Sequence, residues 1–149
     1  MLYTSGEMIE TIHIAAALIE NDKDEILVLL RQKGQLEEKT YGLPGGKIEP
    51  GETREEAVIR EINEEIGITV KPGNLEFLRT FEWNREINQK IFRIKFELFK
   101  LKSWFSAGNI KLQPSEAVRY MWAKPESLYQ RKNLMVGMYV ILNAIYKIK

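Results

Sequence analysis

The chain has 149 residues, a formal net charge of +1, 44% hydrophobic residues and 29% charged residues. This length and composition predict one compact globular domain over residues 1–149, with a sizeable buried core. The charge gives no overall attraction to nucleic acid or membrane, and the absence of cysteine excludes disulfides, thiolate metal sites and cysteine nucleophiles. The N-terminal apolar runs are too short for a signal peptide or a membrane span, so we expect a cytoplasmic protein.

Two β-rich runs open the chain, Thr11–Ile19 and Glu25–Arg31, and the polar segment 21–24 between them has the composition of a hairpin connection. A glycine-rich turn is then predicted at Gly45 and Gly46. Backbone carbonyls in such a turn are not obstructed by side chains, so they are available as ligands.

A helix is predicted from about Thr53 to Ile66, after a turn at 50–51. Thr53 and Glu56 have the spacing of a capping box, in which each side chain binds the other residue's backbone N–H. Gly67 can adopt the left-handed conformation that ends a helix. One arc of about 100° is apolar and is expected to pack against a sheet. Its members are Val58, Ile59, Ile62 and Ile66.

Glu61, Glu64 and Glu65 lie on another face of this helix, because the spacing i, i+3 and i+4 gathers their carboxylates. Like charges repel, and the last turns of a helix favour cations, so the cluster requires a positive partner. Hard divalent cations such as Mg²⁺ and Mn²⁺ prefer oxygen ligands. A solvated acidic face is the commoner explanation of a charge run, but it leaves the fixed positions of Glu52 and Arg60 unexplained.

The later elements predict most of a sheet, an irregular segment, one more strand and two helices. In chain order they are Ile68–Lys71, a turn at Pro72–Gly73, Leu75–Trp83, Gln89–Leu101, the irregular Ser103–Gln113, Val118–Ala123, a short helix from Pro125, and an apolar helix over Leu134–Ile148. Helices that alternate with strands predict an α/β fold with a mixed sheet covered on both faces.

The segment from Gly46 to Ile68 reads Gly46-Lys-Ile-Glu-Pro-Gly-Glu52, seven residues, then Arg60-Glu-Ile-Asn-Glu-Glu-Ile-Gly67-Ile68. Its fixed residue types and apolar positions would arise by chance about once in 10⁸ start positions. The segment resembles the Nudix box of the Nudix hydrolases, the MutT-like pyrophosphohydrolases, at every defined position. In that family the box is a loop–helix–loop that binds divalent metal and the diphosphate of a nucleoside diphosphate linked to another group. The resemblance sharpens the expected fold to an α/β/α sandwich.

The resemblance also implies roles for individual residues. Glu61, Glu64 and Glu65 become ligands of Mg²⁺ or Mn²⁺, with the Gly45 carbonyl as a further ligand. Arg60 and Glu52 become a supporting pair that orients the acids. Substrate contacts are expected from Gly46 and Lys47 in the box and from Arg31. Lys33 and Lys39 also lie near the predicted entrance, where all these basic residues have solubility as an alternative role.

The general base is left open between two glutamates. Family members take it either from the box, here Glu61, or from a later loop, where Glu116 precedes the strand at 118–123. Glu116 is expected to support both catalysis and metal binding. A surface glutamate on a loop explains Glu116 about equally well.

The substrate is predicted to be a nucleoside or deoxynucleoside triphosphate, including oxidised forms, that is cleaved to monophosphate and pyrophosphate. Asn133 is expected to cap the last helix, and its place resembles that of the base-reading Asn in the oxidised-guanine branch of the family. ADP-ribose or another nucleotide sugar, a dinucleoside polyphosphate and a capped RNA end stay open. Trp83 to Arg85 occupy the neighbourhood where one ADP-ribose branch has a proline, which counts slightly against that substrate.

Several other residues have simpler explanations. His13 lies between apolar neighbours and is expected to pack or pair locally. Trp83, Trp104 and Trp122 are able to stack on a base, but aromatic residues in strands are more often core. An alternative of another class is a catalytically idle module that binds a nucleotide as a regulatory ligand, and the intact acids argue against it. We expect a monomer or homodimer with a small nucleotide substrate and no stable nucleic-acid partner.

Overall fold

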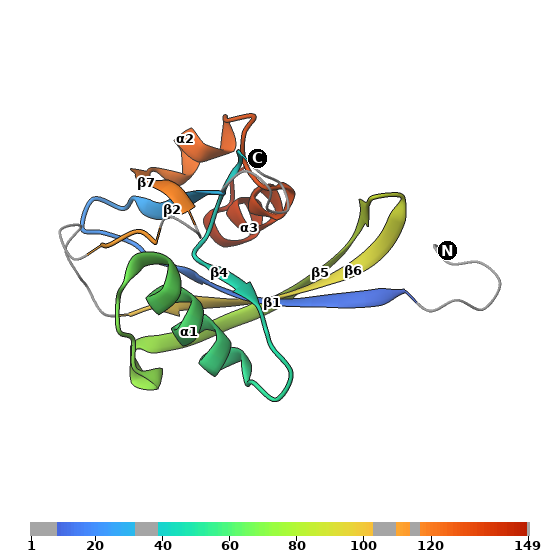
Figure 1. Ribbon diagram of the computed structural model, residues 1–149. Helices are drawn as coiled ribbons and strands as arrows, with labels where there is room; N and C mark the ends of the chain where they lie inside the picture. The colour runs from blue at the N-terminus through green and yellow to red at the C-terminus, as the bar shows by residue number, and fades with distance from the viewer. Residues whose placement is uncertain (1–8, 32–38, 103–109, 114–116, 149) are drawn as a thin grey trace.

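The computed structural model describes residues 9–31, 39–102, 110–113 and 117–148. Two sheets form its centre, one with the strand order β4-β1-β6-β5 and one with the order β3-β2-β7 (Figure 1). The strands are β1 Glu10–Leu18, β2 Ile26–Arg31, β3 Tyr41–Gly42, β4 Gly45–Lys47, β5 Leu75–Ile87, β6 Lys90–Leu101 and β7 Ala117–Ala123. The helices are α1 Arg54–Ile66, α2 Pro125–Tyr129 and α3 Val136–Tyr146, with a short 3-10 turn at Pro72–Asn74.

The four-stranded sheet is mixed, as predicted, because β1 runs parallel to β6 and antiparallel to β4. Side chains alternate along β1, so Ala15 and Ala17 face α1 while Leu18 packs with α3. Each face of the sheets therefore has its own apolar core. This arrangement confirms the predicted α/β fold with helices on both faces. No helix among the described residues is long and apolar enough to span a bilayer.

Local sequence signals place helix α1 where they predicted it. The Thr53 hydroxyl accepts from Glu56 N–H at 3.1 Å, and the Glu56 carboxylate accepts from Thr53 N–H at 2.8 Å. Gly67 ends the helix in the left-handed conformation with φ 70°. The predicted apolar face is buried against the sheet, except that Ile59 is half-buried. The capping box and the glycine terminator are thus confirmed.

The predicted turn at Gly45 and Gly46 is wrong, because both residues lie in strand β4 and pair with β1. A Cβ on Gly45 would lie 2.4 Å from the carbonyl oxygen of Ala15 and 2.5 Å from Cα of Ala16. Only glycine allows this close backbone approach. The glycines therefore serve strand packing against β1.

Asn133 does not cap the last helix, which begins at Val136 with Met135 in the capping position. The Asn133 carbonyl accepts from Tyr41 N–H at 2.8 Å, and Met135 N–H donates to the Tyr41 carbonyl at 2.9 Å. Residues 133–135 therefore extend alongside β3, and this backbone pairing delays the start of the helix.

Strand β5 is longer than predicted, since it continues beyond Trp83 to Ile87. Asn88 and Gln89 connect it to β6 with φ values of 49° and 66°. Such left-handed pairs form the tight turns that join twisted antiparallel strands. The extension places Arg85 on the same strand face as Trp83. The segment 68–71 forms neither strand nor helix.

Candidate active site

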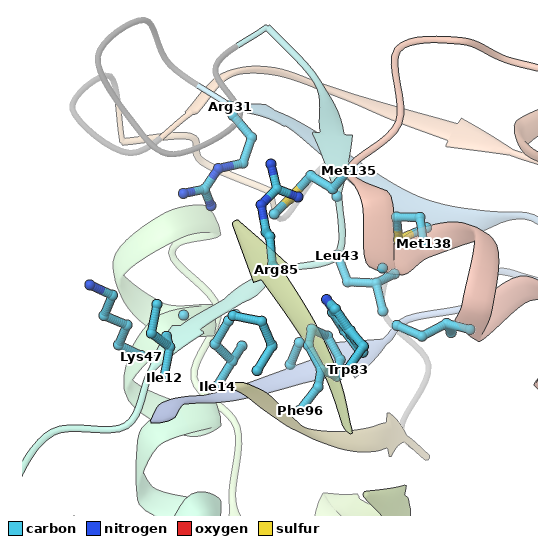
Figure 2. A pocket seen from close by; sticks show the side chains of 17 residues that line it. Ile12, Ile14, Arg31, Leu43, Lys47, Trp83, Arg85, Phe96, Met135 and Met138 are labelled. Atoms are coloured by element: carbon cyan, nitrogen blue, oxygen red, sulfur yellow. The ribbon is translucent and has the colours of Figure 1, made fainter. Parts of the chain in front are cut away.

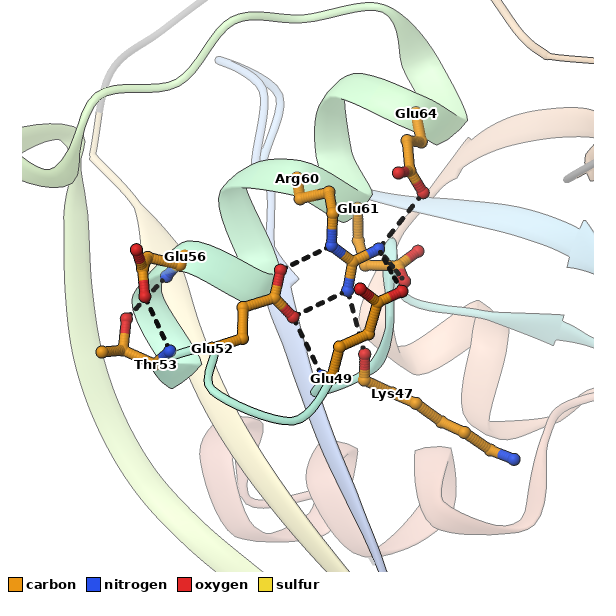
Figure 3. Close-up of polar contacts among 8 residues, drawn as sticks. All are labelled: Lys47, Glu49, Glu52, Thr53, Glu56, Arg60, Glu61 and Glu64. Atoms are coloured by element: carbon orange, nitrogen blue, oxygen red, sulfur yellow. Dashed lines mark hydrogen bonds and ion pairs between the residues drawn. The ribbon is translucent and has the colours of Figure 1, made fainter.

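Arg60 connects helix α1 to the loop that precedes it (Figure 3). Its Nε donates to Glu52 Oε2 at 2.6 Å, and its Nη2 donates to Glu52 Oε1 at 2.9 Å. Nη2 also donates to the Lys47 carbonyl at 3.1 Å. A guanidinium that holds a carboxylate with two parallel hydrogen bonds fixes geometry as well as charge. The position of the loop relative to α1 is therefore set by Arg60.

The remaining guanidinium nitrogen of Arg60 gathers the acidic face of α1. Nη1 donates to Glu61 Oε1 at 3.0 Å and to Glu64 Oε2 at 3.2 Å. The hydrogen bond from Arg60 is the main cause that lowers the pKa of Glu52 to about 2. The same bond is the main cause that raises the pKa of Arg60. Glu49 adds a further contact at 3.9 Å, so one cation faces four carboxylates and the site keeps excess negative charge.

Strand β4 lies directly against two of the helix carboxylates. Gly45 N–H donates to Glu65 Oε1 at 2.7 Å, and Glu65 is only 5% exposed. A Cβ on Gly46 would lie 2.5 Å from Glu61 Oε1. The absence of a side chain at Gly46 therefore leaves the space that the Glu61 carboxylate occupies. The site that β4 and α1 form together is called the acidic corner below, and it consists of Gly45, Gly46, Glu52, Arg60, Glu61, Glu64 and Glu65.

The donor chemistry of this corner fits a hard divalent cation, because it consists of carboxylate and backbone oxygens with excess negative charge. Within the described ranges, however, no three acidic or histidine side chains gather closely enough to coordinate a metal. Arg60 Nη1 binds Oε1 of Glu61 and Oε2 of Glu64, and so fixes the orientation of both carboxylates. The Glu64 side chain is 45% exposed, so its orientation can adjust to a bound cation.

A cavity of about 130 Å³ opens next to this corner, between the four-stranded sheet and α3 (Figure 2). Its walls are mainly apolar and aromatic, and Gly45, Gly46 and Lys47 of β4 form the wall shared with the corner. Arg31, Lys47 and Arg85 contribute its charged groups. The walls come from Ile12, Ile14, Ala16, Gly42, Leu43, Trp83, Ile94, Phe96, Met135, Gly137, Met138 and Ile141.

Two glycines bring the walls of this cavity together. A Cβ on Gly42 would lie 2.4 Å from the sulfur of Met135, and a Cβ on Gly137 would lie 2.5 Å from the indole ring of Trp83. Helix α3 therefore packs directly on Trp83, whose ring centroid lies 5.7 Å from that of Phe96. These contacts fix the width of the cavity.

The structure brings some of the predicted substrate residues together and separates others. Arg31, Gly46 and Lys47 line the cavity. Asn133 does not line it, and its side-chain oxygen accepts from Arg131 at 3.0 Å. Glu116, Lys33 and Trp104 lie outside the described residues. Arg85 also lines the cavity and was not among the predicted residues. The alternation of side chains along a strand would have placed Arg85 on the same face as Trp83 if the predicted strand had continued beyond residue 83.

His13 pairs with a neighbouring strand, and it lies on the face of β1 opposite the cavity, because Ile12 and Ile14 on either side of it line the cavity. Its Nε2 lies 3.0 Å from a carboxylate oxygen of Glu97, which is 3% exposed. Burial raises the pKa of Glu97, but hydrogen bonds from Thr80 and His13 and the charge of Arg54 outweigh it, so the pKa is lowered. Glu97 therefore remains charged at its buried position between the sheet and Arg54 at the start of α1.

Comparison with known proteins agrees with this geometry. The NUDIX domain profile matches residues 11–144. An 8-oxo-dGTP diphosphatase of Haemophilus influenzae is 34% identical over 93 residues, which are 62% of this chain but only 64% of that protein. A CTP pyrophosphohydrolase of Escherichia coli is 30% identical over 120 residues, 80% of each chain.

The solved structures agree as well. The MutT protein of Methanosarcina mazei Go1 superimposes with a TM-score of 0.74 and 26% identity, over 96% of this chain and 100% of that one. The profile match extends over most of the chain and includes both the acidic helix and the sheet beneath it. The chain belongs to the Nudix hydrolase family.

Proposed function

We propose that the protein is a divalent-metal-dependent pyrophosphohydrolase that cleaves a nucleoside or deoxynucleoside triphosphate, oxidised forms included, to monophosphate and pyrophosphate. One observation carries the proposal: the acidic corner around Arg60 shares β4 with an aromatic cavity. The corner has the chemistry to act on a metal-bound diphosphate, and the cavity has the shape and apolar walls to hold a nucleobase.

Each group of the corner has a role in this proposal. Glu61, Glu64, Glu65 and the Gly45 carbonyl would hold Mg²⁺ or Mn²⁺. A bound divalent cation neutralises phosphoryl charge and lowers the pKa of water. Arg60 orients the acids through the contacts at 3.0 and 3.2 Å, and Glu52 in turn holds Arg60.

The cationic residues of the cavity bind the rest of the substrate in this proposal. Lys47 projects from β4 at the wall shared with the corner, and Arg31 ends β2 on another side of the cavity. Both provide N–H donors to phosphate oxygens. Asn133 remains a candidate for base reading, which requires its side chain to leave Arg131.

The general base is proposed to be Glu116 or Glu61. Glu61 is held on a rigid helix by Arg60, whereas a glutamate on a separate loop would support an in-line water from a side that the helix does not supply. We expect Glu116→Gln to lower kcat with little effect on KM. In pH–rate profiles at saturating Mg²⁺, loss of the acidic limb in Glu61→Gln or Glu116→Gln alone assigns the base to that residue. Retention of the limb in both variants excludes both.

A substrate screen tests the proposed function. Purified protein with Mg²⁺ is assayed against nucleoside triphosphates, oxidised triphosphates, nucleotide sugars and dinucleoside polyphosphates. We expect pyrophosphate release from at least one triphosphate, and none in the presence of chelator. Exclusive cleavage of nucleotide sugars or dinucleotides would replace the proposed substrate class. Binding of nucleotides without any cleavage would favour the idle module.

A further inference from the structure

Trp83 and Arg85 form a pair on one face of β5. They are two residues apart, and alternate side chains of a strand point to the same side about 7 Å apart. Both line the cavity, and in Figure 2 they arise from the same strand, with the Arg85 side chain extending towards Arg31 and Met135 in this view. A planar ring that enters this cavity and contacts the indole of Trp83 therefore also meets the cavity wall to which Arg85 belongs.

The indole of Trp83 is held in place from two sides. Phe96 packs on it with a ring distance of 5.7 Å and an interplanar angle of 31°. Gly137 of α3 approaches so closely that an added Cβ would lie 2.5 Å from the ring. The part of the indole that these contacts leave open lines the cavity, and an aromatic surface contacts any nucleobase without strong sequence preference. Trp83 alone therefore accounts for binding a base, but not for choosing among bases.

Arg85 supplies the chemistry for that choice. A guanidinium has hydrogen-bond donors and no acceptor, and it fits two acceptors that lie side by side. Guanine presents such a pair in O6 and N7, whereas adenine presents a donor, its N6 amino group, beside N7. Among the residues that the structure describes, none that lines the cavity is acidic, so this part of the lining offers no carboxylate to accept from an amino group.

We propose that Trp83 and Arg85 are specificity-determining residues, with Trp83 stacking on the base and Arg85 donating to O6 and N7 of a guanine-type base. This inference rests on the proposed function, since it names which nucleotides the same site prefers. A phosphate contact is the other chemistry open to Arg85, and it would act equally on all bases. The pattern of loss across bases therefore separates the two roles.

The test compares kcat/KM for dGTP and dATP in the parent and three variants. We expect the parent to prefer dGTP by about 10-fold or more, and Arg85→Gln to remove this preference, since Gln pairs with N6 and N7 of adenine. Arg85→Lys keeps the charge and should retain only part of the preference. Arg93→Gln, which removes an exposed arginine from the neighbouring strand β6, is the matched control and should retain all of it.

Equal losses for dGTP and dATP in Arg85→Gln, or a parent without preference for dGTP, would overturn the inference. Calorimetric binding of GMP and AMP provides a second readout that does not depend on hydrolysis. Tighter binding of GMP that disappears in Arg85→Gln supports the inference even when no triphosphate is cleaved. Equal binding of GMP and AMP by the parent contradicts it, whether or not the proposed function holds.

Discussion

The acidic corner and the cavity are built in opposite ways, although they share β4. The hydrogen bonds of Arg60 described above all reach residues between Lys47 and Glu64, at the end of β4, in the loop that follows and on α1. The cavity instead draws its walls from residues between Ile12 and Ile141, on separate strands and a helix. A site whose residues lie in one contiguous segment can be predicted from their spacing in the sequence, whereas a binding cavity depends on how distant segments pack. Substitutions in each region should therefore have distinct effects.

Substitutions in the acidic corner should change turnover more than any other substitution considered below. Glu64→Gln should lower kcat on the order of 10²-fold or more, and a chelator should abolish activity of the parent. In metal-free buffer the same variant should be as stable as the parent or more stable, because one of several neighbouring anions is removed. Steady-state kinetics and thermal unfolding measure the two effects. Full activity in chelator, or marked unfolding of the metal-free variant, would show that this acid has a structural role.

Gly46→Ala separates chemistry from folding within the corner. Its Cβ would lie 2.5 Å from the Glu61 carboxylate, which is the end of a flexible side chain and is able to move. We expect kcat to fall about 10-fold or more while the melting temperature changes little. Gly73→Ala is the control, because nothing lies within 4 Å of its added Cβ. Equal kinetics for the two variants would mean that the position of Glu61 is unimportant.

Gly137→Ala is the corresponding test of the cavity. The added Cβ would lie 2.5 Å from the ring of Trp83, so the indole or α3 must shift. Overpacking of this kind costs about 1–3 kcal/mol, against which alanine regains about 1 kcal/mol of helix propensity. We expect KM to rise several-fold, with kcat much less affected. Denaturant titration and kinetics measure both, and a fall in kcat alone would show that the two regions are not separable.

The smallest effect is the pH dependence of the link between loop and helix. The pKa of Glu52 is lowered from 4.5 to about 2, mainly by the hydrogen bond from Arg60. A carboxyl with a lowered folded-state pKa stabilises the fold above its unfolded pKa, and this stabilisation is lost as pH falls from about 4.5 towards 2. Glu52→Gln should therefore lose more stability relative to the parent at pH 6 than at pH 3. Denaturant unfolding at both pH values tests this, and an equal difference would contradict it.

Features that depend on neighbours in the chain were predicted correctly, whereas features that depend on distant segments were not. The capping box of Thr53 and Glu56 and the terminator Gly67 involve only neighbours in the chain, so their geometry was predictable. The strand conformation of Gly45 depends on pairing with β1, and the position of Asn133 depends on pairing with Tyr41. Neither partner is identifiable from local sequence, because such pairing is decided by tertiary packing.

The same distinction applies to the placement of the candidate site residues. Spacing on one helix put Glu61, Glu64 and Glu65 on one face, and Arg60 does gather the first two. Arg85 was missed because its strand extends through a tight turn beyond the predicted end. Its place in the cavity also requires α3, which lies more than 50 residues further along the chain.

Mn²⁺ binding followed by electron paramagnetic resonance tests whether the acidic face of α1 holds a divalent metal. The parent should bind Mn²⁺, and Glu64→Gln should bind it about 10-fold more weakly or worse, because one carboxylate ligand is lost. Glu86→Gln, which removes an exposed carboxylate from β5, should bind as the parent does. Equal Mn²⁺ affinity in the parent and Glu64→Gln would show that Glu64 is not a metal ligand.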